Sequence, residues 1–172
     1  AAMDGLGNAS QLLGNFSEAI KLQSLALDIN EEIGDLEGVG TSANNLGNTL
    51  IKTEEFSEAE KIIMKGIRAW ESLRSSLQDL QKISLIDTQK TAYALLQESL
   101  VKQQKYCEAL VVSERGRTQA FIDLLRDRSL STGSETPVSK ISNKLITASA
   151  IQNLAQRLDI TLVEYSIIKE AA

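Results

Sequence analysis

A chain of 172 residues with an apolar share of 42% can hold one domain with a real core, or one domain and the edge of another. Its net charge of −5 argues against a general affinity for nucleic acid, and no apolar run approaches the roughly 20 residues that cross a membrane. A single cysteine excludes an internal disulfide and fits a reducing compartment, so we expect a soluble, cytoplasmic protein.

Short sequence repeats set the architecture of the first two thirds of the chain. The sequence Phe-Ser-Glu-Ala at 16–19 recurs at 56–59, and a looser copy, Tyr-Cys-Glu-Ala, follows at 106–109. Leu-Gly-Asn at 6–8 recurs at 46–48, again 40 residues on. A repeat of this length is too small to bury its own apolar face, so consecutive copies must stack on one another.

The apolar spacing within each copy is helical. Few aromatic residues and a single proline also suit helices packed on helices. Ser17 and Ser57 are candidate caps at helix starts, and glycine in mid-helix at Gly7 and Gly47 predicts a close helix crossing. The predicted helices cover about 2–14, 17–33, 36–53, 57–78, 83–103 and 106–128.

The amino-acid composition of the chain changes after the third repeat. Residues 129–147 contain Ser, Thr, Gly and the only proline, and they read as a linker. A short helix is expected from 148, and 160–168 is rich in β-branched and aromatic residues, which predicts a strand. Because a lone strand needs partners for its backbone groups, we expect 148–172 to be the start of a second, truncated domain.

The repeated residues resemble tetratricopeptide repeats of the longer, roughly 40-residue kind. The resemblance covers residues 1–128 and implies an all-α, right-handed α-α superhelix of about three helical hairpins. The third copy departs from the pattern at Gln97, where the glycine is lost. Such repeats imply a protein-interaction scaffold.

A second resemblance concerns the later part of the chain. The segments 70–74, 93–97, 114–125 and 161–166 are similar to bacterial, often cyanobacterial, proteins in which tetratricopeptide repeats precede a CHAT domain. CHAT is a caspase-like protease module that works with a His and a Cys. This chain has no histidine, and its one cysteine, Cys107, lies in the repeat sequence. No catalytic residue is therefore carried over, and we expect no enzyme activity.

Asparagines form the candidate binding site. Asn44 and Asn48 lie one turn apart on one face of a predicted helix, and Asn8 continues the row in the first repeat. Similar repeats use this inner face to grip an extended peptide, and an amide suits that task because it both donates and accepts. The alternative is that these asparagines pack between helices. Three further residues would flank the row: Thr41, Ile51 and Lys52.

Arg115 and Arg117 give the last repeat helix a basic edge that could dock an acidic partner or the CHAT module within the same protein. The alternative is a solvated face. Acidic pairs at helix ends without histidine predict no metal site, and the glycines at 38 and 40 follow no strand, which excludes a phosphate loop. No cofactor is expected.

The sequence thus predicts a scaffold that binds a peptide or a cognate module in its concave groove and regulates a C-terminal caspase-like protease. A structural module that self-associates into homo-oligomers through its exposed repeat ends is the alternative. Neither reading involves nucleic acid or membrane.

Overall fold

The computed structural model describes residues 2–76, 79–117, 153 and 156, and every element within 2–76 and 79–117 is a helix. A further helical segment at 106–117 follows the five helices of this list: α1 Ala2–Leu12, α2 Phe16–Glu32, α3 Leu36–Lys52, α4 Phe56–Ser76 and α5 Asp79–Lys102. The all-helical expectation is confirmed for these residues. The predicted linker at 129–147 and strand at 160–168 lie outside them.

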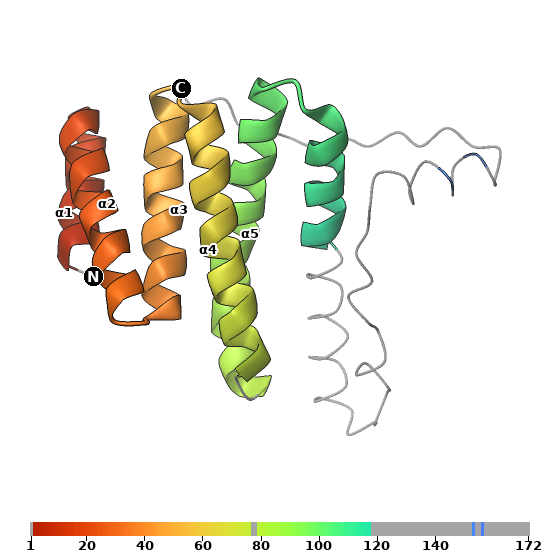
Figure 1. The fold of residues 1–172 in the computed structure, drawn as a ribbon, viewed down its shortest axis with the longest axis horizontal. Helices are drawn as coiled ribbons and strands as arrows, with labels where there is room; N and C mark the ends of the chain where they lie inside the picture. Colours follow the sequence, from red (N-terminus) through yellow and green to blue (C-terminus); the bar gives the residue numbers. More distant parts are fainter. Residues whose placement is uncertain (1, 77–78, 118–152, 154–155, 157–172) are drawn as a thin grey trace.

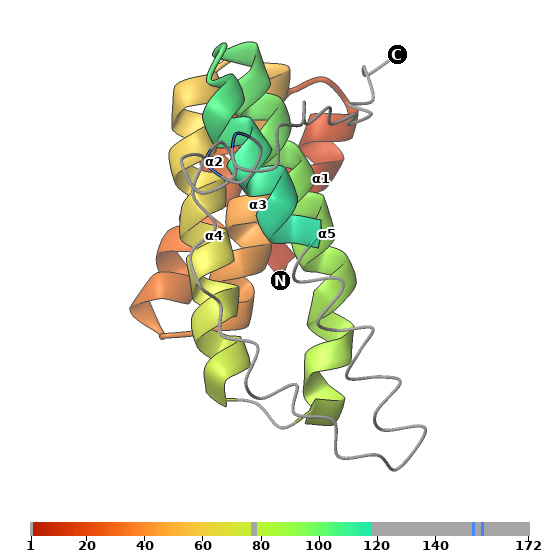
Figure 2. The same cartoon turned by 90° about the vertical axis from the view of Figure 1, so that its right-hand side faces the viewer.

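The helices form a row of hairpins arranged in two layers. Each helix packs on its neighbours in sequence, from α1 through α5 (Figure 1). In addition the backbone of α3 lies close to those of both α1 and α5, whereas the backbones of α2 and α4 lie further apart. Figure 2 shows the same arrangement from the end, with α2 and α4 on one side and α1 and α5 on the other. The first helices of the three repeats therefore form a close inner layer, and the second helices a more open outer layer.

Four turns of one type connect these helices. After α2, Gly34 has a φ of 71°, and its N–H donates to Glu31 O while the next N–H, of Asp35, donates to Asn30 O. This pair of hydrogen bonds is the Schellman arrangement, which closes a helix with a residue in the left-handed region. The same pair occurs at the ends of α1, α3 and α5. The turn at Asp35 also begins α3, because its side chain accepts a hydrogen bond from Gly38 N at 3.0 Å.

Two helix starts differ from the prediction. Ser17 and Ser57 lie inside α2 and α4, which begin one residue earlier, at Phe16 and Phe56. Asn15 occupies the N-cap position of α2, without a side-chain hydrogen bond. The serines therefore do not cap these helices, because each is already the second residue of its helix.

The core is aliphatic and centres on α3 and α4. Ala43, Leu46 and Leu50 of α3 are buried against Ile63, Ile67 and Trp70 of α4. The core cluster draws its buried residues mainly from the second repeat and from the helices on either side of it. The first repeat therefore contributes few apolar side chains to the core. None of the described helices is both long enough and apolar enough to cross a membrane.

Candidate binding groove

Five of the predicted site residues lie on α3, at the centre of the inner layer. Asn44 and Asn48 are half-buried and one turn apart, and Thr41 and Lys52 are exposed at the two ends of the row. Ile51 is different, because only 8% of its surface is exposed and it belongs to the hydrophobic core. Thr41 Oγ1 donates to Glu37 O within its own helix. The helix therefore offers two amides, a hydroxyl and an ammonium group along one surface.

Asn44 carries an acceptor that the described residues do not use. Its Oδ1 is buried and has no hydrogen-bond partner among them. A buried amide oxygen without a partner costs about 1–3 kcal/mol. A donor brought by a ligand would remove that cost if the half-exposed amide rotated so that its oxygen faced the ligand.

Asn8 lies in a chain of hydrogen bonds between helices. Its Oδ1 accepts from Gln23 Nε2 at 2.9 Å, and Gln23 Oε1 accepts from Thr49 Oγ1 at 2.7 Å. Gln11 Nε2 donates to the same Thr49 oxygen at 2.8 Å. This polar chain joins α1, α2 and α3, so one amide atom of Asn8 is already engaged in helix packing.

Gln23 and Thr49 were not singled out by the sequence, although both side chains are completely buried. A signal was available for Gln23. It stands 40 positions before Ile63, so an amide replaces an apolar core residue at the same place in the repeat. A polar residue at a repeat position that is otherwise apolar indicates a buried hydrogen bond.

The two arginines of the predicted docking edge are both paired within the chain. Arg115 Nη2 lies 2.7 Å from Glu71 Oε1, which also accepts a hydrogen bond from the Tyr93 hydroxyl at 3.1 Å. Arg117 Nη1 lies 2.8 Å from Glu114 Oε1, three residues earlier in the same helix. The Arg115 pair ties the helix at 106–117 to α4, so part of this edge holds the repeats together.

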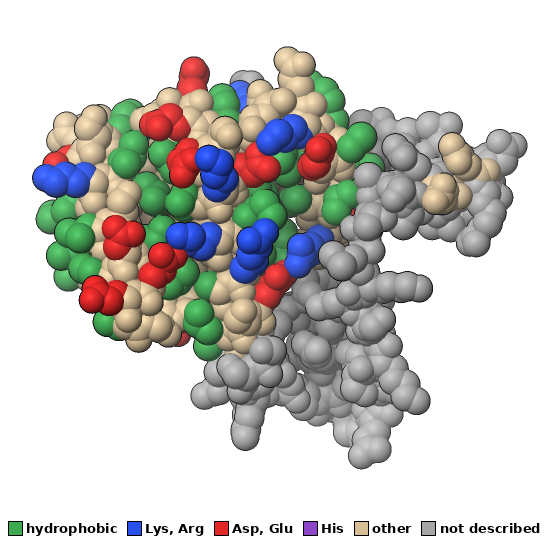
Figure 3. Space-filling model, viewed as in Figure 1, with side chains coloured by type: hydrophobic (Ala, Val, Ile, Leu, Met, Phe, Trp, Pro, Cys, Tyr) green, Lys and Arg blue, Asp and Glu red, His purple; other side chains and the backbone are tan. Residues whose placement is uncertain are grey.

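The outer layer presents charges of both signs. Figure 3 shows acidic and basic side chains interspersed over the face formed by α2 and α4. Lys65 Nζ bridges these two helices by an ion pair with Glu31 at 2.7 Å. Lys61 Nζ donates to Glu58 at 2.8 Å, and this bond raises the pKa of Lys61. Exposed pairs of this kind contribute little to stability because water screens them, so this face is a solvated surface.

No group of acidic or sulfur side chains that could hold a metal ion occurs within the described part of the chain. Cys107 is exposed at the start of the last helical segment, and the whole sequence lacks histidine. A thiol needs a neighbouring base or positive charge to become a nucleophile.

Comparison with known proteins supports one class of repeat for the first part of the chain. Residues 1–72 match a family model described as "Tetratricopeptide repeat". This match supports the tetratricopeptide-repeat domain expected from the sequence, and it covers the first two hairpins. Repeats of this family generally mediate protein–protein interaction, and proteins built from them are generally non-catalytic scaffolds.

Two curated relatives carry the same designation. The chain is 34% identical over 112 residues to mouse "Tetratricopeptide repeat protein 28" and 35% identical over 101 residues to its human counterpart. These matches cover 64% and 58% of this chain but only 5% and 4% of the relatives, so the chain corresponds to a small part of their length. No solved structure gives a significant match.

Proposed function

We propose that the inner layer of this repeat domain binds an extended peptide, or a cognate module, along α3. The observation that carries the proposal is the pair Asn44 and Asn48, half-buried one turn apart, with the Asn44 oxygen unpaired among the described residues. Successive peptide groups offer alternating donors and acceptors, which two amides on one helix face can match. Lys52, at the end of the row, favours a partner with negative charge at that end.

The flanking residues take unequal parts in this proposal. Thr41 and Lys52 are exposed and available to a ligand, while Ile51 supports the groove from the core. Asn8 extends the row only through the amide atoms that Gln23 does not engage. We therefore assign the main contacts to α3 rather than to α1.

The test uses peptides selected from a random library displayed on phage, enriched on the unaltered chain and then titrated by fluorescence anisotropy. Asn44→Ala combined with Asn48→Ala should weaken the selected peptides by about tenfold or more, because each lost hydrogen bond contributes about 1 kcal/mol. Asn15→Ala is the matched control, since Asn15 is exposed in a turn and its side chain makes no capping bond. Unchanged affinity in the double variant, with an unchanged thermal midpoint, would remove α3 as the binding surface.

We further propose that, in the intact protein, the repeats regulate a C-terminal caspase-like CHAT module. The support is the similarity of segments 70–74, 93–97, 114–125 and 161–166 to proteins of that arrangement. Peptide binding would act by changing the equilibrium between two placements of the module. The test measures peptide hydrolysis by the longer polypeptide with and without a groove-binding peptide; equal rates at saturation would contradict regulation.

A second candidate, self-association, rests on the apolar ends of the repeat row. Leu6 of α1 is 58% exposed, whereas Leu46, its equivalent on α3, is buried in the core. At the other end Tyr106 is 62% exposed, whereas its equivalent Phe56 packs against the core. A second copy could therefore place its last helix against α1, as α2 packs on α3, and cover both surfaces.

A further inference from the structure

The second helix of the first repeat, α2, carries a stripe of apolar side chains that the described residues leave open to solvent. Leu25, Ile29 and Ile33 are exposed and follow one another at intervals of four residues, and half-buried Leu22 continues the stripe toward the start of the helix. Intervals of three and four residues place all of them on one side of a helix. Figure 1 shows that α1 and α2 form the first end of the repeat row.

The equivalent side of α4 is a contact between helices. Forty residues after the stripe, α4 has Lys65, Ala69 and Leu73. Lys65 forms its ion pair with Glu31 of α2, and Ala69 is buried. Leu73 packs against the core. Because Glu31 comes two residues after Ile29, it lies on nearly the opposite side of α2. The stripe therefore occupies the side by which one outer helix meets the outer helix before it.

Exposed apolar residues are concentrated at this first end. Of the nine large apolar side chains that are exposed among the described residues, eight lie between positions 3 and 36, and Tyr106 is the ninth. A head-to-tail contact would set this surface against the last described helix, which offers one such side chain. A second copy of the first end offers a complete matching set. Apolar complementarity therefore favours pairing of two first ends, related by a two-fold axis.

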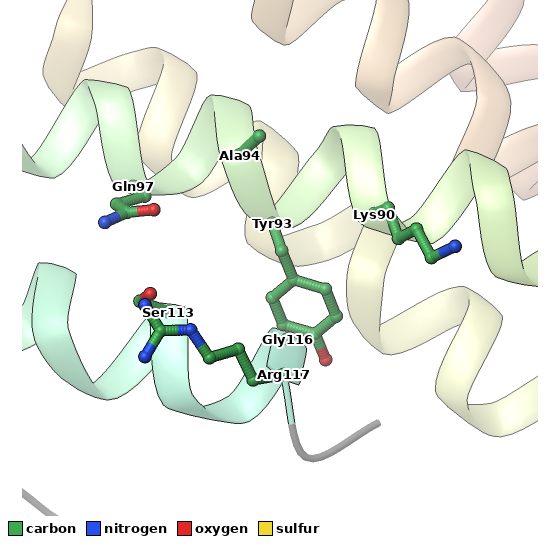
Figure 4. Close-up of a pocket in the computed structure, with 7 residues that line it drawn as sticks. All are labelled: Lys90, Tyr93, Ala94, Gln97, Ser113, Gly116 and Arg117. Carbon is green, nitrogen blue, oxygen red and sulfur yellow. The ribbon is translucent and has the colours of Figure 1, made fainter. Parts of the chain in front are cut away.

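The other end of the described row has a different surface. Figure 4 shows the hollow between α5 and the helix at 106–117, and charged and amide side chains contribute to its lining: Lys90, Gln97 and Arg117. An apolar stripe placed over this end would cover polar groups that water now reaches, which is unfavourable. The surface chemistry of this end therefore also argues against a head-to-tail contact.

Charges beside the stripe distinguish the two orientations of such a pair. Lys21, Asp28 and Glu32 are exposed along one edge of the stripe. In a parallel pair, each of these charges meets its own copy. In an antiparallel pair, Leu25 of one copy can lie against Ile29 of the other. Lys21, one turn before Leu25, then lies beside Glu32 of the other copy. Asp28 lies near its own copy in both orientations, so the other two charges favour the antiparallel pair.

Lys21 is weakly held within its own chain. Its Nζ lies 4.0 Å from Glu18, and both side chains are largely exposed. The equivalent Lys61 of α4 lies 2.8 Å from Glu58. Lys21 can therefore move to a second carboxylate with little loss of its present interaction.

We propose that two copies of the chain pair through α2, antiparallel about a two-fold axis, with Leu25 and Ile29 at the centre of the contact and ion pairs between Lys21 and Glu32 at its edges. The proposal rests on the self-association candidate and assigns the same first end as the surface of the second copy. It does not involve the peptide groove on α3. Since this contact occupies the stripe of both copies, assembly stops at the dimer, whereas a head-to-tail contact leaves a free end and continues to larger species.

Sedimentation equilibrium of the 172-residue chain separates these arrangements. From about 1 to about 300 μM, a range suited to a small interface, the mass should rise toward that of two chains and then stay constant. A monomer mass throughout would overturn the proposal. Growth beyond the dimer would also overturn it, while keeping the head-to-tail form of self-association.

Leu25→Lys tests the centre of the contact. It introduces the residue that α4 has at the equivalent position, Lys65, and Leu25 is exposed in the single chain, so circular dichroism should stay unchanged. The variant should remain monomeric at every concentration, because its charge would be buried against an apolar side chain. A dimer of undiminished affinity would overturn the proposal.

Charge reversal tests the orientation. Lys21→Glu and Glu32→Lys should each weaken the dimer about threefold or more, because both edge pairs then bring like charges together. An equimolar mixture of the two variants should dimerise more strongly than either alone, since every edge pair of the mixed dimer joins opposite charges. A mixture no stronger than its components would overturn the antiparallel arrangement.

Lys61→Glu is the matched control, because it changes the net charge equally at the equivalent position of α4 and should alter the dimer less than twofold. An equal loss in this control would show only a general charge effect and would contradict the contact. None of these substitutions lies on α3, so the peptides selected for the groove should bind all the variants as before. Failure of the dimer is therefore separable from failure of the groove.

Discussion

Glycines of the repeated Leu-Gly-Asn sequence stand where the paired helices come closest. A Cβ at Gly7 would lie 2.7 Å from Gln23 Cγ, and one at Gly47 would lie 2.2 Å from Ile63 Cγ1. The close crossing that these glycines predicted is confirmed. A Cβ at Gly5, two residues before Gly7, would have no neighbouring atom within 4 Å. Helix packing therefore does not require glycine at this position.

This difference predicts opposite effects of the same substitution. Gly47→Ala should lower the free energy of unfolding by about 1–2 kcal/mol, because Ile63 is buried and must move. Gly5→Ala is the matched control in an open helix site and should raise it by up to about 1 kcal/mol through helix propensity. Urea denaturation followed by circular dichroism measures both. A stabilising Gly47→Ala would mean that Ile63 moves aside at little cost.

At the scale of elements, the Schellman turns give the hairpins their common shape. Gly14 and Gly34 hold the left-handed position with φ of 77° and 71°, but Glu54 and Gln104 hold the equivalent position with φ of 63° and 60°. A residue with a Cβ is strained in this region by about 1–2 kcal/mol, and glycine is not. All four turns therefore have the same left-handed residue, although only two of them have glycine at that position.

The turns supply a reciprocal test. Glu54→Gly should raise the free energy of unfolding by about 0.5–1 kcal/mol, because relief of backbone strain exceeds the added freedom of the unfolded chain. Gly34→Ala should lower it by about 1 kcal/mol, since it introduces the same strain. Thermal melts of the two variants alongside the unaltered chain measure both effects. A loss of stability in Glu54→Gly would indicate that this turn carries no strain.

At the largest scale, the described part of the chain is a short row of repeats with apolar side chains at its first end. Large apolar residues at that end are strongly exposed, and they gather over α1 and the turns beside it: Leu6, Leu12, Leu13 and Ile33, at 58%, 87%, 78% and 68%. Figure 3 shows hydrophobic side chains grouped over this part of the molecule. Exposed apolar side chains at one end of a repeat row favour association with a second surface.

Self-association can be measured directly. If a second copy covers this end, sedimentation velocity should show a mass that rises with concentration, and Leu6→Glu should shift the chain toward monomer by placing a charge in the contact. Ser57→Glu introduces the same charge at an exposed position of α4 and should leave the association unchanged. A constant monomer mass across the concentration range would remove the self-association proposal and leave the peptide groove unaffected.

Much of the fold was predictable because its determinants are local. The recurrence of 16–19 at 56–59, and the turn residues at Gly14 and Gly34, determined the number and order of the first hairpins. Helix ends followed to within a few residues, except that Ser17 and Ser57 were taken for caps. Those assignments failed because each helix begins one residue earlier than predicted, so the serines lie inside the helices, and a single residue type does not fix a helix boundary that closely.

The binding surfaces were only partly predictable, because they depend on which helices meet. The sequence by itself determined a repeat of about 40 residues, its helical hairpins, and an asparagine pair on one face of α3. Tertiary structure alone decided that Asn8 accepts a hydrogen bond from Gln23 and that Arg115 pairs with Glu71. Helical periodicity is a property of neighbouring residues, whereas these partners come from separate helices, and only packing brings their atoms within bonding distance.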